Sequence, residues 1–235
     1  MKPVQKTLAL GLLLLGSTAA NATTWLFEDL AAYNGGPVGD QLSTVTSTFN
    51  DVTEQFTWDV TFNSDPTAID GFWLVVNNGP NPKSSDVNEL AIMYGDMDTG
   101  VLTTYVYNGQ NNANSISNPN ILLQTDTFGV GSDSLSIDID ASAINAWNTA
   151  QTSPDYTGIA FDNNIGIWFH IATGSNFGYD NGPDTITSFS FGSQGWYDKS
   201  WLTAVQVPEP ASLLLIGLSM LGLGSWRRRT GSVPA

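Results

Sequence analysis

The stretch Gln55-Phe-Thr-Trp-Asp-Val-Thr-Phe-Asn63 alternates polar and apolar side chains without a break. Because successive side chains of a β-strand point to opposite faces, its large apolar side chains share one face. These side chains are Phe56, Trp58, Val60 and Phe62. The residues between them are Thr and Asp, which suit a solvated face. The stretch therefore predicts a half-buried strand of an antiparallel sheet.

Residues 134–140 alternate in the same way. Ten other runs are rich in Val, Ile, Thr and aromatic residues and predict further strands. They span residues 24–29, 41–49, 72–77, 89–94, 101–107, 121–128, 159–161, 165–171, 185–191 and 201–205. Residues 141–150 suggest one short helix, capped by Asp140 or Ser142. Many short strands with one helix predict an all-β fold, namely a jelly-roll or concanavalin-like antiparallel β-sandwich.

Composition narrows the class of protein further. The 235 residues include eight Trp and eleven Phe, enough apolar bulk for a packed core, and no Cys, which excludes a disulfide scaffold. Of the 22 acidic residues, 21 lie between Thr23 and Val207, where Lys83 and Lys199 are the only basic ones. A surface with this charge repels phosphate groups. We therefore expect no nucleic-acid partner.

The N-terminal end has the features of an export signal. Residues 1–22 begin with a short basic segment, continue through the apolar run 8–16, and close on the small residues Ala20 and Ala22. This order is typical of a secretory signal peptide, which signal peptidase would cut after Ala22. Residues 23–206 are then one extracytoplasmic β-sandwich domain.

The C-terminal end, residues 207–235, has three parts in a fixed order. Pro208, Glu209 and Pro210 come first, and proline should keep this segment out of regular strands and helices. An uncharged run at residues 211–226 follows, about 24 Å long as a helix, against about 30 Å for the bilayer core. The part after it is the basic cluster Arg227, Arg228 and Arg229. We expect a single transmembrane helix at 211–226, with the arginines as stop-transfer charges on the cytoplasmic side.

These three parts resemble the PEP-CTERM sorting signal of bacterial exosortase substrates. The resemblance implies that a membrane-embedded exosortase recognises Pro208, Glu209 and Pro210 and removes the helix, so that the chain is only a transient inner-membrane intermediate. Residues 230–235 extend beyond the basic cluster, where such signals usually end. The alternative is a permanent single-pass anchor in which the Pro-Glu-Pro sequence is accidental.

Motifs for catalysis are absent from the sequence. The single histidine, His170, lies in the strand-like run 165–171 on the same face as Trp168, which favours a strand-surface or semi-buried residue over a catalytic base. No Gly-x-Ser-x-Gly, His-Glu-x-x-His or phosphate-binding glycine loop occurs. We therefore expect no catalytic residues and no enzymatic activity.

Two groups of residues are candidates for binding. Asp96, Asp98, Asp180 and Asp184 lie in turn-rich segments, where carboxylates and amides could hold calcium or simply form turns. Trp196, Tyr197 and Trp201 lie close together beside an acidic residue and could stack on sugar rings, for example of an exopolysaccharide, or belong to the core. Calcium is the one cofactor that these residues suggest.

These observations lead to one main hypothesis. We expect an exported, non-enzymatic protein of a Gram-negative bacterium that exosortase delivers to the cell surface or extracellular matrix, in the envelope or a biofilm. One alternative is a calcium-assisted carbohydrate-binding module, whose retention on a glycan EDTA would abolish. Another is a secreted hydrolase, which would need two carboxylates within catalytic distance.

Overall fold

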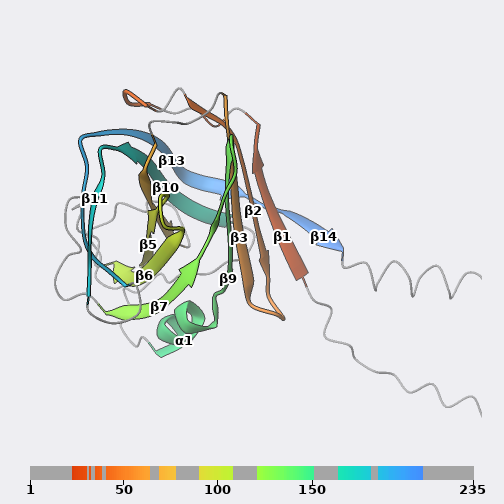
Figure 1. The fold of residues 1–235 in the computed structure, drawn as a ribbon. Coiled ribbons are helices and arrows are strands. Elements are labelled where there is room, and N and C mark those ends of the chain that lie inside the picture. Colours follow the sequence, from red (N-terminus) through yellow and green to blue (C-terminus); the bar gives the residue numbers. More distant parts are fainter. Residues whose placement is uncertain are drawn as a thin grey trace, which may run out of the picture.

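The computed structural model describes residues 23–30, 32, 35–38, 41–63, 69–77, 90–107, 121–150, 164–180 and 185–208. In these ranges the chain forms two six-stranded antiparallel sheets and a separate two-stranded sheet (Figure 1). One hydrophobic cluster joins the facing sides of the two large sheets. The all-β sandwich predicted from the strand pattern is therefore confirmed. The predicted strand at 159–161 and the predicted transmembrane helix at 211–226 lie outside the described residues.

The first sheet has the strand order β14-β1-β2-β3-β9-β8. Its strands are β1 (Thr23–Asp29), β2 (Leu42–Asn50), β3 (Gln55–Phe62), β8 (Gly129–Val130), β9 (Ser134–Asp140) and β14 (Val205–Pro208). The order brings the N-terminal strand and the last strand together at one edge. The alternating stretch that begins at Gln55 forms the inner strand β3, as its pattern predicts.

The second sheet has the strand order β13-β10-β4-β5-β6-β7. Its strands are β4 (Gly71–Asn77), β5 (Leu90–Asp96), β6 (Val101–Tyr107), β7 (Leu122–Thr127), β10 (Asn164–Thr173) and β13 (Ser193–Thr203). The third sheet is a hairpin of β11 (Asn176–Tyr179) and β12 (Ile186–Ser190). Sequence patterns missed β8, β11, residues 193–200 of β13 and residues 206–208 of β14.

Large aromatic side chains fill the space between the two large sheets. Phe56 and Trp58 of β3 are fully buried, and the Trp58 ring lies 5.4 Å from the Phe169 ring of β10, centroid to centroid. Tyr197 of β13 is also fully buried and contacts Trp58 at 6.4 Å. Such ring pairs stabilise the core beyond the burial of their area.

A second cluster lies on the outer face of the second sheet. It contains Trp73, Tyr94 and Trp168 from the sheet and Ile186 and Phe189 from the β11–β12 hairpin. The hairpin therefore packs over this face, on the side away from the first sheet (Figure 1). Strands β4, β5, β6 and β10 of the second sheet are thus buried on both faces, whereas β3 of the first sheet is buried on one.

The helix α1 (Ser142–Ala150) follows β9 directly. Of the two predicted caps, Asp140 is the one that acts: its Oδ1 accepts a hydrogen bond from the Ser142 backbone N–H at 2.8 Å. This bond lowers the pKa of the Asp140 carboxyl, because it favours the charged form. Ile144 anchors the helix on the core. In the part of the chain that the structure describes, no helix is long and apolar enough to cross a membrane.

Candidate functional site

The single histidine lies in a transverse row on the outer face of the second sheet. Strand register places Trp196, His170, Trp73 and Tyr94 directly beside one another on β13, β10, β4 and β5. Neighbours in such a row contact each other across the strands. The Trp73 and His170 rings are 4.5 Å apart with an interplanar angle of 34°, so the imidazole is partly stacked on the indole.

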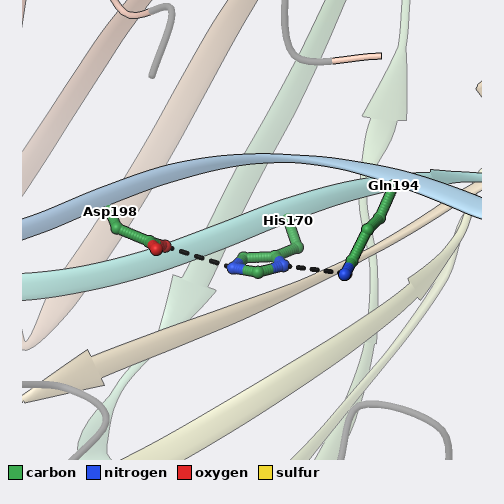
Figure 2. Close-up of polar contacts among 3 residues, drawn as sticks. All are labelled: His170, Gln194 and Asp198. Carbon is green, nitrogen blue, oxygen red and sulfur yellow. Dashed lines mark hydrogen bonds and ion pairs between the residues drawn. The ribbon is translucent and has the colours of Figure 1, made fainter. Parts of the chain in front are cut away.

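The ring nitrogens of His170 both have polar partners (Figure 2). Nδ1 lies 3.1 Å from Gln194 Oε1, and Nε2 lies 3.1 Å from Asp198 Oδ1. Only 5% of His170 is exposed. The sequence predicted a strand-surface or semi-buried residue, and His170 is buried because the rings of Trp73 and Trp168 lie against it. Both ring nitrogens of His170 are therefore engaged by side chains of the neighbouring strand β13.

The predicted sugar platform is not assembled. Trp196 and Tyr197 are consecutive residues of β13, so their side chains point to opposite faces of the sheet. Tyr197 is fully buried in the core, which removes it from any surface. A Cβ added at Gly35 or Gly36 would come within 2.7 Å of the Trp196 ring, so the glycine backbone packs directly on that indole. The side chain of Trp201 lies outside the described residues.

Tyr197 instead ties β13 to β1 in the core. Its hydroxyl donates a hydrogen bond to Asp29 Oδ2 at 3.1 Å, and the Lys199 ammonium lies 3.0 Å from the same oxygen. Burial and the nearby Asp29 charge raise the pKa of the Tyr197 hydroxyl well above its ordinary range. This contact joins the two sheets and leaves Tyr197 with a structural role.

The candidate calcium ligands are also separated or engaged. Asp96 is buried and its carboxylate accepts hydrogen bonds from the Asp98 backbone N–H and the Tyr179 hydroxyl. Asp98 and Asp180 are exposed, and Asp184 lies outside the described residues. Within the described ranges no group of three metal-ligating side chains is found. Asp96 therefore closes a turn and anchors the β11–β12 hairpin.

Further polar contacts hold that hairpin on the second sheet. The Tyr105 hydroxyl donates to the Ile186 carbonyl at 2.8 Å, and the Ile186 N–H donates to Thr103 Oγ1 at 3.0 Å. Burial, with a smaller contribution from Asp180, raises the pKa of the Tyr105 hydroxyl. No pattern in the sequence indicates these contacts, since they join residues more than 80 positions apart.

The segment predicted for sorting begins inside the first sheet. β14 pairs antiparallel with β1, and the register places Pro208 opposite Thr23 and Val207 opposite Thr24. Pro208 was expected to lie outside regular strands, but it is the last residue of β14. An edge strand tolerates proline, because only one of its sides needs donors. The domain boundary predicted after residue 206 therefore divides a strand.

Comparison with known proteins identifies this segment. Residues 206–229 match the model of the PEP-CTERM protein-sorting motif. The molecule is thus an antiparallel β-sandwich that ends in a sorting signal, and that signal is of the PEP-CTERM type. The motif implies export, sorting to the cell surface and processing by exosortase. The match starts one residue before the predicted signal and stops at Arg229, leaving out the extra tail.

Other comparisons add little. No curated protein matches the chain. A solved structure described as "pH-induced modulation of Streptococcus parasanguinis adhesion by Fap1 fimbriae" matches with 15% sequence identity and a TM-score of 0.26. That match covers 78% of this chain and 96% of the other.

Proposed function

We propose that this protein is exported through its N-terminal signal peptide, held briefly in the inner membrane and released by exosortase as a non-enzymatic protein of the cell surface or extracellular matrix. The observation that carries the proposal is the PEP-CTERM match at residues 206–229, which begins within the last strand of the β-sandwich. In this proposal Pro208, Glu209 and Pro210 are the recognition site.

Charge order supports the membrane step. The uncharged run 211–226 precedes Arg227, Arg228 and Arg229, and basic residues next to an apolar span remain in the cytoplasm. The β-sandwich would then stand outside, where an acidic and hydroxyl-rich surface keeps a protein hydrated. A span this short holds the chain weakly, as suits a transient anchor.

The environment of His170 supports a non-enzymatic role. Both of its ring nitrogens are engaged, and its ring is enclosed by Trp73 and Trp168 at 4.5 and 4.6 Å. A general base must reach the proton that it abstracts. With 5% of its surface exposed, the one histidine of the chain has little of that access.

The test is to replace Pro208-Glu209-Pro210 by three alanines in cells that contain the sorting protease. The chain offers a matched control, since Pro80-Asn81-Pro82 has the same proline spacing and can be replaced in the same way. We expect intact mass spectrometry to find wild type and control shortened at the C-terminus, and the first variant at full length in the membrane fraction. Identical C-termini and distribution in all three would refute the proposal.

A further inference from the structure

The last strand of the sandwich and the sorting motif share residues. β14 comprises Val205–Pro208, and the motif match begins at residue 206. Gln206, Val207 and Pro208 therefore pair with β1 and also form the start of the sorting signal. A protease that binds the start of the motif must therefore compete with β1 for the backbone of these three residues.

Covalent geometry makes this competition direct. Pro208 lies opposite Thr23 in the sheet. Glu209 is the next residue after Pro208, and consecutive Cα atoms are about 3.8 Å apart. No spacer separates the paired strand from the Pro-Glu-Pro sequence. Peptides are commonly bound as extended strands that hydrogen-bond to their receptor along an edge. A protease embedded in the membrane would have to enclose Pro208 while the bulk of the domain lies against it.

β14 is well suited to leaving the sheet. It is an edge strand with only β1 as a neighbour in its sheet. Val205 is 67% exposed and Val207 is 37% exposed. Release of its four residues would extend the reach of the motif by about 13 Å, at about 3.3 Å per residue. The inner strands β2, β3 and β9 keep their own partners when β14 leaves.

We propose that β14 is the surface that the sorting protease binds, and that the protease takes it as an extended strand in exchange for β1. This inference rests on the proposed function and adds which part of the folded domain must open. Once the apolar run 211–226 has been cut away, β14 returns to β1, beside the Thr23 end that signal peptidase leaves. Both processed ends of the mature chain then lie at one corner of the first sheet.

A disulfide lock tests the exchange. The chain contains no Cys, so an engineered pair has no competing thiol. Thr24 and Val207 are directly opposite each other on β1 and β14. The Cα–Cα distance of such a pair lies in the range that a disulfide can bridge. In the oxidising extracytoplasmic space, Thr24→Cys with Val207→Cys should keep the full-length form in the membrane fraction. Dithiothreitol should restore processing. The matched control joins β1 to β2 through Glu28→Cys and Thr46→Cys, which are also paired, and it should be processed like wild type.

A rescue variant separates the lock from misfolding. A second copy of residues 205–207, inserted before Pro208 in the locked protein, supplies an unpaired strand to the protease while the first copy stays bound to β1. We expect processing to return in oxidised cells. Processing of the locked protein at the wild-type rate with its disulfide intact, or failure of the inserted copy to restore it, would overturn the inference. If wild type itself is never shortened, the proposed function fails instead.

Discussion

The outer faces of the two large sheets differ in almost every respect. On the first sheet, β2 and β3 present hydroxyls and carboxylates to solvent, and the hydroxyls pair across the strands, as in Thr48 Oγ1 with Thr57 Oγ1 at 2.7 Å. On the second sheet, the outer face of β4 and β10 carries Trp73, Trp168 and His170, all at least 95% buried. One sheet meets water there, and the other meets the β11–β12 hairpin.

The sequence of each strand explains the difference. β3 alternates strictly, so it has a face for the core and a face for solvent. β4 reads Gly-Phe-Trp-Leu-Val-Val-Asn, a nearly continuous apolar run of the kind that is buried on both faces. A continuous run in an antiparallel sheet therefore requires a cover. The structure identifies that cover as the β11–β12 hairpin, which begins about 100 residues further along the chain than β4 ends.

The largest expected effect comes from truncating the covered face. Trp73→Ala removes a fully buried indole beneath Phe189 and Phe191 and should lower the free energy of unfolding by about 3–5 kcal/mol. Thr46→Ala, at a solvated position of the first sheet, should change it by less than about 0.5 kcal/mol. Urea unfolding of both variants measures the contrast. Similar losses for the two would mean that the faces do not differ in energy.

A smaller loss of unfolding free energy is expected at the contact between Asp198 and His170 on the outer face of the second sheet. Asp198→Ala leaves His170 Nε2 without its carboxylate neighbour and should cost about 1–3 kcal/mol. Asp198→Asn keeps a hydrogen-bonding oxygen at the same place and should cost less. Thermal unfolding of the two variants measures this difference, and equal destabilisation would show that the contact contributes through packing alone.

Sequence patterns predicted the strands of the two large sheets better than the hairpin that covers the second sheet. Alternation placed Phe56, Trp58 and Ile137 in the core, and all three are fully buried. The same reasoning cannot show that Asp96 accepts a hydrogen bond from Tyr179, because only the folded chain brings these residues together. β14 was missed for a local reason. Its proline argues against a strand, and that argument fails at the edge of a sheet.

The candidate sites show the same division. The sorting signal is a contiguous stretch whose order of charge and apolarity is visible in the sequence, and the family comparison confirms it. The sugar platform grouped Trp196 with Tyr197 because they are adjacent in sequence. Adjacent residues of a strand face opposite sides, so this proximity could not make a surface.

A local effect is expected at the attachment of the hairpin. Tyr179→Phe removes the hydroxyl that donates to Asp96 and should weaken the hold of the hairpin by about 0.5–1.5 kcal/mol. Amide hydrogen exchange should become faster at Ile186 and Phe189 while amides of β3 keep their protection. A uniform change across both sheets would show instead that the hairpin and the sandwich open together.

The smallest effect is expected at the solvated sheet, where Asp140 caps α1. Its pKa is lowered in the folded chain by the bond from the Ser142 N–H, so its contribution to stability is complete above the ordinary carboxyl pKa of about 4. That contribution is lost as the pH falls through the lowered value. Asp140→Asn keeps a capping oxygen but does not titrate, so its melting temperature should depend less on acid than that of wild type. If the two melting temperatures fall in parallel below pH 4, the acid sensitivity lies in other carboxylates and not in the Asp140 cap.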